Sequence, residues 1–375
     1  MRLSKQLFPE RYVVPEDSSS LPTYKLIERV GFVEFTIPGV PTFLPLGQIL
    51  IKKICDIIRE EAVTEGFNEV YFPLFEKVDI LNKSGAYQPY KEQYIRVDFP
   101  KKDLVLTATS EEPILELALS GLHSYRQLPI KLFQIADKFR YVTRTKGIIR
   151  GRQFLSADFT CLVADKKSLE ETTNSFENLA QRAFTSMGLS PQRVSKGRDY
   201  VDFVITSEDG EQRDNSGNKA FSIGMYHKYV LTPVFQPTFL NKEGQAQNIL
   251  IGTYGIGIQR CLISIIEQQR DSKGISFSEK IKPFLYSIIV IEPRDNRQLE
   301  VAINIYERLK EKSKKIMLDD RTNLTFKQKA DFSDFLGIPE KIIIGKREVS
   351  TGFLTVKNRG GDKEEKINLE DLLKK

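Results

Sequence analysis

Histidine and cysteine are scarce in this chain of 375 residues. With only His123 and His227, a histidine-rich metal site or a Ser-His-Asp relay has too few imidazoles. Cys55, Cys161 and Cys261 lie far apart and form no CxxC pattern, which indicates neither a zinc site nor a disulfide framework. We therefore expect three buried thiols and assign no residue as a metal ligand.

Long apolar runs and a strong charge imbalance are also missing. No stretch approaches the roughly eighteen apolar residues of a membrane helix, and the first twenty residues contain no apolar core of a signal peptide. The net charge of +6 permits an RNA partner but falls short of the field of a protein that coats nucleic acid nonspecifically. These features predict a cytoplasmic protein without a membrane or DNA partner.

The length and an apolar content of 40% predict two domains, each with its own core. In the first part, residues 48–67 show the spacing of a long amphipathic helix, and a strand broken at Pro73 follows. Residues 131–142 and 150–163 are typical of two strands of an antiparallel hairpin, and residues 168–189 predict a helix that stops at a glycine. Residues 249–268 predict a strand, a glycine turn and a helix.

The pattern changes after a polar stretch at residues 271–284, which contains glycine and proline and indicates a boundary. Beyond it, apolar strands at residues 284–291, 315–320 and 341–346 alternate with predicted helices. Such alternation is typical of a small α/β domain with a largely parallel sheet.

Three segments in fixed order, together with shorter phrases, resemble the class II aminoacyl-tRNA synthetases of the prolyl type. The helix and strand ending at Pro73 are similar to motif 1 of that family, KFRYVTRTKGIIRGRQF (residues 138–154) to motif 2, and GTYGIGIQR (residues 252–260) to motif 3. The phrases LPLG, TSEE and LDDR add to the resemblance, which covers nearly the whole chain. It implies an α+β fold: an antiparallel-sheet catalytic domain over residues 1–278, then a small α/β anticodon-binding domain over residues 279–375.

The resemblance also implies roles for cations that handle ATP. Arg140 would hold the α-phosphate and the carboxylate of the amino acid, since a guanidinium can bridge two anions. Arg150 would meet the outer phosphates, and Phe154 would stack under the adenine while Arg260 covers its other face. Arg140 and Arg260 are thus the expected catalytic residues, and no general base is required because positioning and charge lower the barrier.

Gly255 and Gly257 would, by the same resemblance, let the backbone approach the nucleotide closely. Thr109 and Glu111, two residues apart in an extended segment, would accept hydrogen bonds from the charged imino group of proline. Read from the residues alone, Thr109 and Glu112 also have the spacing of a helix capping box, and the two interpretations are compatible.

In the C-terminal domain, the resemblance implies that basic residues receive the anticodon stem of tRNA through its phosphates. The candidates are Lys327, Lys329, Lys346 and Arg347. Taken without the family, these side chains are equally consistent with a solvated surface.

Four positions depart from the family pattern. Val142 stands where motif 2 has a glutamate that reads adenine, and Ser222 where a carboxylate helps to hold ATP-bound magnesium. Met225 and Val163 each stand where a histidine is expected, the latter just beyond motif 2 and beside the amino-acid pocket. Only about ninety residues separate Asp158 from Gly252, too few for the editing insertion of many bacterial prolyl enzymes. We expect no proofreading within this chain.

The function that the resemblance implies is an ATP-dependent proline–tRNA ligase that uses Mg²⁺ and acts as a homodimer. Two alternatives stay open: an inactive paralogue that binds tRNA or a protein partner, and a ligase for a different small amino acid or acceptor. A carboxylate near Ser222 that replaces the missing one would favour an enzyme, and an empty site would favour the paralogue.

Overall fold

The chain packs as two units in the computed structural model, which describes all residues except 198, 229–236, 313, 362 and 375. The large unit comprises Phe35–Pro41 and Ile51–Ser264, and the terminal unit comprises Met1–Glu34, Thr42–Leu50 and Ile265–Lys375. The division falls inside helices α2 (Pro45–Thr64) and α7 (Ile258–Gln268). The domain boundary expected after residue 278 stays a prediction.

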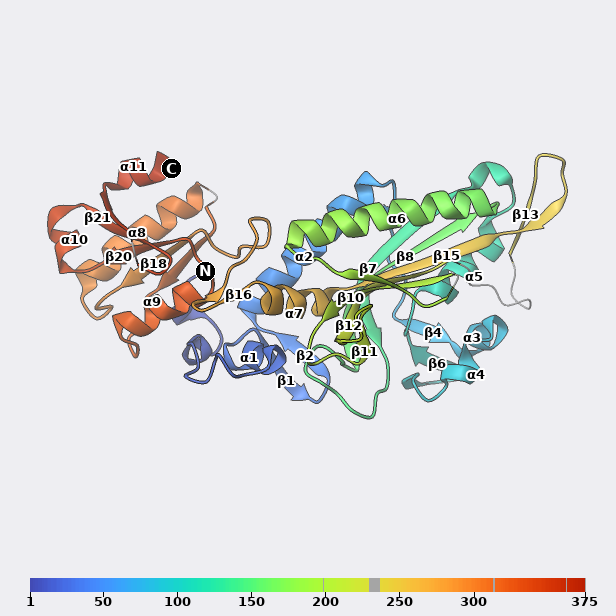
Figure 1. Cartoon of the computed structure of the whole chain (residues 1–375), viewed down its shortest axis with the longest axis horizontal. Coiled ribbons are helices and arrows are strands. Elements are labelled where there is room, and N and C mark those ends of the chain that lie inside the picture. Colours follow the sequence, from blue (N-terminus) through green and yellow to red (C-terminus); the bar gives the residue numbers. More distant parts are fainter. Residues whose placement is uncertain (198, 229–236, 313, 362, 375) are drawn as a thin grey trace. The chain divides into compact units, whose positions relative to one another are not determined.

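The large unit is built on an eight-stranded sheet with the order β3-β7-β8-β15-β12-β10-β9, in which β11 pairs with β12 (Figure 1). The pairing of β3 with β7 is parallel, whereas the other pairings along this order are antiparallel, as expected. The strands are β3 (Asn68–Glu69), β7 (Ile130–Phe139), β8 (Gln153–Val163), β9 (Gln192–Ser195), β10 (Tyr200–Thr206), β11 (Gln212–Arg213), β12 (Lys219–His227) and β15 (Leu250–Gly257).

Helix α6 (Lys166–Met187) lies along one face of this sheet, where it contacts β8 and β15 (Figure 1). The Asp165 side chain accepts a hydrogen bond from Ser168 N at its start, and Gly188 ends it in a left-handed conformation, which confirms the predicted helix. The ring of Phe176 packs 4.8 Å from that of Tyr254 and 5.3 Å from that of Phe159. This aromatic contact anchors the helix on the central strands.

Smaller elements of the large unit flank the main sheet. Strands β4 (Phe75–Lys77), β6 (Lys102–Leu106) and β5 (Arg96–Phe99) form a three-stranded antiparallel sheet in that order. Strands β13 (Thr238–Leu240) and β14 (Ala246–Asn248) pair, as do β1 (Val33–Ile37) and β2 (Val40–Phe43). The remaining helices are α3 (Val78–Ser84), α4 (Tyr87–Tyr90), α5 (Glu111–Gly121) and the 3₁₀ turn η3 (Tyr125–Gln127).

The terminal unit contains a five-stranded sheet with the order β19-β18-β20-β21-β22. Its first three strands are parallel, which confirms the predicted alternation of strands and helices, whereas β21 and β22 add an antiparallel hairpin that the sequence did not predict. The strands are β18 (Tyr286–Val290), β19 (Ile316–Asp319), β20 (Glu340–Ile344), β21 (Leu354–Asn358) and β22 (Glu364–Ile367). The helices are α8 (Asn296–Glu311), α9 (Phe326–Phe335), α10 (Lys346–Thr351) and α11 (Leu369–Lys374).

The first residues of the chain pack on this sheet, which the sequence also did not predict. The terminal unit begins with η1 (Leu3–Lys5), η2 (Pro9–Arg11) and α1 (Thr23–Arg29), and includes the short pair β16 (Arg270–Asp271) and β17 (Gly274–Ile275). Arg321 is only 2% exposed and donates to both carboxylate oxygens of Asp319. Its remaining nitrogen donates to the carbonyl oxygens of Pro9 and Tyr12, so one buried ion pair holds the amino-terminal segment in place.

All three cysteines are buried, as expected. Among the helices of the described part of the chain, none is long and apolar enough to cross a membrane. Burial raises the pKa of Cys55 and of Cys161 to about 12, so these thiols are unreactive packing residues at neutral pH.

The close packing of the first turn of α2 can be tested by substitution of Gly47. A Cβ atom at this position would stand 2.1 Å from the carbonyl oxygen of Phe32, a backbone atom that cannot rotate away. We expect Gly47→Ala to lower the free energy of unfolding by about 2 kcal/mol, measured by urea unfolding followed by circular dichroism. Gly121→Ala is the matched control, because nothing lies within 4 Å of its added Cβ. Equal stability of the two variants would contradict the close packing.

Candidate active site

Two cavities on the large unit share Gln93, Arg140 and Met225. The glutamate cavity, of about 470 Å³, is lined on one side by Thr109, Glu111 and Glu112. The arginine cavity, of about 380 Å³, has Arg140 at the boundary and is lined further by Arg150, Phe154, Gly255, Gly257 and Arg260. The residues expected to handle an amino acid and those expected to handle a nucleotide therefore line two cavities with common walls.

Arg140 follows the last residue of β7 and is placed by the β7–β8 hairpin. Its backbone N donates to Arg152 O (2.9 Å), so the hairpin ladder continues one step past the strand. Its guanidinium donates from Nη2 (3.0 Å) and Nε (3.3 Å) to Ala108 O, and it lies 5.2 Å from the centre of the Phe154 ring. These contacts fix the guanidinium while leaving Nη1 directed to neither of these partners.

The arginine cavity carries an excess of positive charge. Arg260 donates from Nε to Ile149 O and from Nη1 to Ser222 O, both at 2.9 Å. The carboxylate of Glu211 lies 3.2 Å from Arg150 Nη1 and 3.9 Å from Arg260 Nη2. Burial, the largest cause, lowers the pKa of Arg260, although a guanidinium still keeps its proton at physiological pH. Three arginines and only two carboxylates, Glu211 and Asp158, line this cavity, which makes it a site suited to a polyanion.

Gly255 and Gly257 lie inside β15, which leads directly into α7, so the predicted glycine turn between strand and helix is wrong. The added Cβ of Gly255 would lie 3.9 Å from Met225 Sδ, and that of Gly257 would lie 3.6 Å from Arg260 Cβ, both ordinary contact distances. The protein itself leaves room for side chains there. Close approach of a nucleotide therefore stays a prediction for these two glycines.

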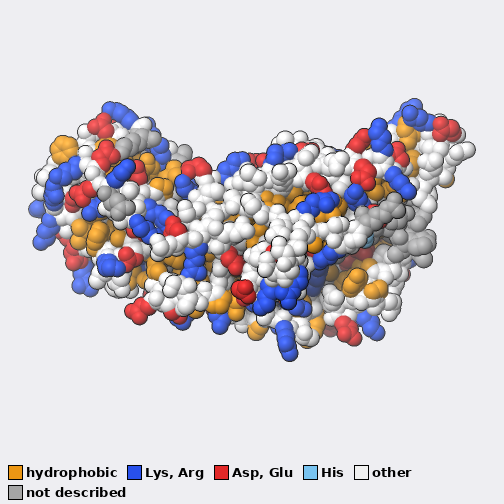
Figure 2. Space-filling view, viewed as in Figure 1, with side chains coloured by type: hydrophobic (Ala, Val, Ile, Leu, Met, Phe, Trp, Pro, Cys, Tyr) orange, Lys and Arg blue, Asp and Glu red, His pale blue; other side chains and the backbone are white. Residues whose placement is uncertain are grey.

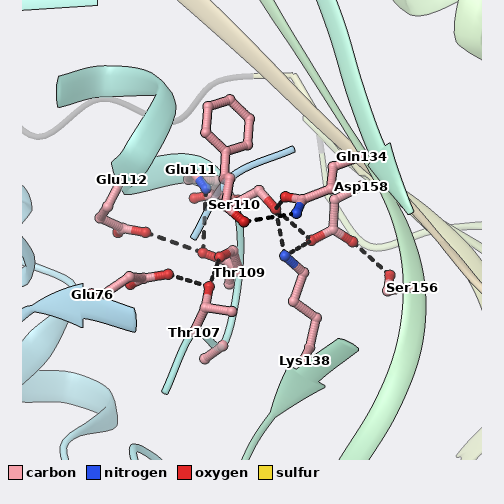
Figure 3. Close-up of polar contacts among 12 residues, drawn as sticks. Glu76, Thr107, Thr109, Ser110, Glu111, Glu112, Gln134, Lys138, Ser156 and Asp158 are labelled. Atoms are coloured by element: carbon pink, nitrogen blue, oxygen red, sulfur yellow. Dashed lines mark hydrogen bonds and ion pairs between the residues drawn. The ribbon is translucent and has the colours of Figure 1, made fainter. Parts of the chain in front are cut away.

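Thr109 and Glu111 do not lie together on an extended segment, because α5 begins at Glu111 with Ser110 as its N-cap. Thr109 Oγ1 donates to Glu112 Oε2 (3.1 Å) and accepts a long bond from Glu111 N (3.5 Å), as Figure 3 shows. Thr109 and Glu112 therefore interact at the start of the helix, though Ser110 and not Thr109 is its cap. Thr109 and Glu111 still line the same cavity.

A further carboxyl group, Glu76, lies behind the wall of the glutamate cavity that contains Thr109, Glu111 and Glu112. Ser84 Oγ donates to Glu112 Oε1 (3.2 Å), and Thr107 Oγ1 contacts Glu76 Oε1 (Figure 3). Glu76 is 5% exposed. Burial and then the charge of Glu112 raise the pKa of Glu76 to about 8, and the same two causes raise the pKa of Glu111. The cavity wall is therefore rich in carboxyl groups that do not all ionise readily.

A buried lysine links this wall to the main sheet. Lys138 is 1% exposed, donates to Ser110 Oγ (2.5 Å) and lies 3.4 Å from Asp158 Oδ2 (Figure 3). Ser156 Oγ donates to the other oxygen of Asp158 at 2.5 Å. The sequence reasoning missed this network, although the alternation of β7 puts Gln134 and Lys138 on one face, and Gln134 pairs directly with Asp158.

Three of the four departures from the family pattern line the cavities, whereas Val163 is buried at the end of β8 and lines neither. Val142 lines the arginine cavity and Met225 lines both cavities. Ser222 Oγ donates to Asp202 Oδ1 at 3.0 Å, and Asp202, 2% exposed, also forms an ion pair with Lys196 at 2.5 Å. A carboxylate therefore does stand beside Ser222, supplied by the neighbouring strand β10.

The tRNA candidates differ in exposure. Lys346 and Arg347 are exposed, and the side chain of Lys327 is 84% exposed. Lys329 is 0% exposed and donates to Val290 O (2.8 Å), so burial in the core makes the tRNA interpretation wrong for this residue. On the face shown in Figure 2, basic side chains of the terminal unit are interspersed with acidic and neutral ones. Phe353, missed by the sequence reasoning, is 53% exposed and lines a 320 Å³ hollow with Arg347.

The described residues contain no group of three or more His, Cys, Asp or Glu side chains that could hold a metal ion. Mg²⁺ that arrives with a nucleotide needs only one or two carboxylates, since phosphates and water complete its shell. In the arginine cavity, Glu211 and Asp158 are carboxylates of this kind. The donor set fits a phosphate-bound magnesium and not a metal held by protein alone.

Two family models match the chain, one on each side of the polar stretch at residues 271–284. Residues 94–269 match the tRNA synthetase class II core domain (G, H, P, S and T), and residues 286–375 match an anticodon binding domain. The first match contains both cavities' arginines and Glu111. The second contains the parallel strands of the terminal unit.

Curated relatives match over nearly their full length. The chain is 28% identical over 423 residues to a proline–tRNA ligase of Wolbachia sp. subsp. Brugia malayi (strain TRS), covering 100% of this chain and 99% of the relative. It is 25% identical over 437 residues to a proline–tRNA ligase of Bartonella quintana (strain Toulouse), with the same coverage.

Solved structures show the same fold at lower identity. Giardia lamblia prolyl-tRNA synthetase in complex with prolyl-adenylate superposes with a TM-score of 0.79 at 20% identity, over 97% of this chain and 77% of that one. Cryptosporidium parvum prolyl-tRNA synthetase complexed with L-proline and AMP gives 0.77 at 17% identity, over 96% and 75% of the two chains.

The raised pKa of Glu76 predicts a pH-dependent stability. From its ordinary value of 4.5 to about 8, folded Glu76 keeps a proton that the unfolded chain releases. Stability contributed by this group is therefore lost as pH rises through that window, by up to about 1.4 kcal/mol per pH unit. Glu76→Gln cannot ionise. The free energy of unfolding of this variant, relative to that of the wild type, should therefore increase from pH 5 to pH 8 and stay constant above pH 8.

Glu116→Gln is the matched control for this measurement, because its carboxylate lies on the same side of the unit, is 45% exposed and pairs with Lys77 at the surface. Urea unfolding across the pH range measures all three proteins. Parallel curves for Glu76→Gln and the wild type would contradict a protonated Glu76.

Proposed function

We propose that this chain, which belongs to the class II aminoacyl-tRNA synthetases, is an ATP-dependent proline–tRNA ligase that forms prolyl-adenylate and transfers the prolyl group to tRNA. One observation carries the proposal: Arg140 stands at the boundary shared by the glutamate cavity and the arginine cavity. An amino acid and a nucleotide bound in the two cavities would meet at its guanidinium.

Formation of the adenylate needs little more than an amino acid and ATP held together at Arg140. The carboxylate oxygen of proline attacks the α-phosphorus of ATP, a new P–O bond forms, and the bond to the leaving pyrophosphate breaks. Two anions must approach each other, so fixed cations lower the barrier by offsetting their repulsion and the charge that develops. Arg140 is held by Ala108 O and by the face of Phe154, and it would present its guanidinium to both anions.

The other residues of the arginine cavity would hold ATP. Arg150 would bind outer phosphate oxygens that take over from Glu211, its present counter-ion, and Arg260 would cover one face of the adenine. Phe154 would offer a ring for the adenine to stack on. Magnesium bound to the phosphates would supply charge neutralisation, and Glu211 is the carboxylate we assign to it.

The glutamate cavity would recognise the imino group of proline. Proline carries a positive charge on its nitrogen at neutral pH, and Glu111 with Glu112 places acidic groups beside Thr109. Leu115, Tyr200 and Met225 contribute apolar surface to the same cavity, which suits the aliphatic ring. Charge at one end and apolar walls at the other would orient the carboxylate toward Arg140.

The remaining assignments extend the proposal beyond the site. We assign a cytoplasmic location and a homodimer built on α2 and the strand broken at Pro73, the segments that resemble motif 1. Lys327, Lys346 and Arg347 are the exposed candidates for tRNA phosphates. The domain boundary after residue 278 belongs to the same proposal.

An enzyme is favoured over an inactive paralogue by carboxylates close to the altered positions. Asp202 stands beside Ser222, and Glu211 reaches both Arg150 and Arg260. The site is therefore not empty of acidic groups. The identity of the amino acid is tested by offering alternatives in the same assay.

The proposed role of Arg140 can be tested by substitution. Purified protein should catalyse proline-dependent exchange of pyrophosphate into ATP, and Arg140→Ala should lower the rate by about 10²–10³, the cost of removing a preorganised group that stabilises the transition state. Arg126→Ala removes an exposed arginine side chain that packs on Tyr125, and it is the control that should retain wild-type exchange. Exchange with alanine, cysteine or threonine in place of proline would move the assignment to another amino acid, and no exchange with any of them would support the paralogue.

The proposed contacts with tRNA can also be tested by substitution. A Lys346→Ala, Arg347→Ala double variant should bind tRNA more weakly, and its affinity should depend less steeply on salt, because fewer counterions are released. Pyrophosphate exchange without tRNA should be unaffected. Lys312→Ala, another exposed lysine of the terminal unit, is the control for filter binding across a salt series. An unchanged salt slope in the double variant would exclude these two residues from the interface.

A further inference from the structure

Thr107 lies at the centre of an unusual set of contacts behind the glutamate cavity. Its hydroxyl oxygen contacts Glu76 Oε1 and lies 2.5 Å from the backbone carbonyl oxygen of Thr109. A threonine hydroxyl has a single hydrogen, and a carbonyl oxygen can only accept. If both contacts are hydrogen bonds, Thr107 donates to Thr109 O and the hydrogen between Thr107 and Glu76 must come from Glu76.

The other oxygen of Glu76 points to the same protonation state. Glu76 Oε2 is buried and has no hydrogen-bond partner among the described residues. An ionised carboxylate with one oxygen left bare in the interior is far more costly than the carbonyl oxygen of a neutral acid. Proton placement on Oε1 satisfies the contact with Thr107 and leaves Oε2 as that carbonyl oxygen.

The charges around Glu76 agree. Glu112 and Glu111 line the glutamate cavity in front of it, and the buried cation Lys138 is already engaged with Ser110 and Asp158. An ionised Glu76 would be repelled by negative charge on these neighbouring carboxyl groups. The raised pKa of Glu76, about 8, is the expected result of burial and of the charge of Glu112.

We propose that Glu76 is a protonated positioning residue, which donates to Thr107 so that Thr107 donates to Thr109 O and fixes Thr109 for the imino group of proline. The role in proline binding rests on the proposed function, whereas the proton on Glu76 does not. Thr109 then keeps its own hydroxyl hydrogen for Glu112 Oε2, at 3.1 Å, and its oxygen accepts a long bond from Glu111 N, at 3.5 Å. Under this proposal the donors run in one direction, from Glu76 through Thr107 to Thr109; Figure 3 shows the contacts that connect these residues.

Three variants test whether Glu76 acts as a hydrogen-bond donor or only fills space in the core. Glu76→Gln keeps the size and a donating N–H, so the KM for proline should stay within about twofold of the wild type. Glu76→Ala and Thr107→Val break the chain, so the KM for proline in pyrophosphate exchange should rise about tenfold, as expected for a lost hydrogen bond, while the KM for ATP is unchanged. Glu116→Gln is the control and should match the wild type.

The proton itself is read without activity. The infrared difference spectrum of wild type minus Glu76→Gln at pH 7 should contain the C=O band of a protonated carboxylic acid. Carboxylate bands in its place would overturn the protonation, and a wild-type KM for proline in both Glu76→Ala and Thr107→Val would overturn the positioning role. If the wild type exchanges with no amino acid, the proposed function and the positioning role fall together, and the infrared spectrum still decides the proton.

Discussion

The ladder between β7 and β8 is the constraint on which the site depends. Ten pairs of residues along it set one register, and the next backbone bond, from Arg140 N to Arg152 O, carries that register past the end of β7. Arg140 and Phe154 are placed against each other by this pairing. A slip of one residue would turn each side chain to the opposite face of the sheet and separate the guanidinium from both cavities.

The hairpin also explains how opposite charges are kept apart. Positive groups gather at the end of the hairpin, and carboxyl groups gather around the start of α5. Lys138 joins the two regions, because it contacts both Ser110, the N-cap of α5, and Asp158 of β8. The buried cation compensates part of the charge of Asp158 and of the carboxyl groups near α5, and it does not line either cavity. An amino acid is bipolar in the same sense, and the proposed binding mode would direct its cation to the carboxyl wall and its anion to Arg140.

The fold was largely predictable because its elements have strong local signals. Helices α2, α6 and α8 show regular apolar spacing, and β18 and β20 each contain a run of consecutive apolar β-branched residues. The hairpin β21–β22 lacked such a signal, since β22 consists mainly of exposed charged residues. The attachment of the amino-terminal segment through Arg321 depends on contacts between residues more than 300 positions apart, which no local pattern contains.

The site divides in the same way. Arg140, Arg150, Phe154 and Arg260 could be proposed from the sequence because their motifs are ordered along the chain, and the structure brings them to one cavity. Glu76, Asp202 and Glu211 were missed because each gains its role from a partner on another strand or loop, and Lys329 was misplaced because basic character in the sequence does not reveal burial. Alternation within strands gives which face a residue occupies, but only the assembled sheet gives what it faces.

The central claim is that an amino acid and ATP react at Arg140. Its most direct test is isolation of the intermediate: the protein is incubated with labelled proline, ATP, magnesium and inorganic pyrophosphatase, then passed rapidly through a gel-filtration column. The account predicts label that co-elutes with the protein at close to one per site and is released as prolyl-adenylate on denaturation. Label that never travels with folded protein, whether proline, alanine, cysteine or threonine is offered, would contradict it.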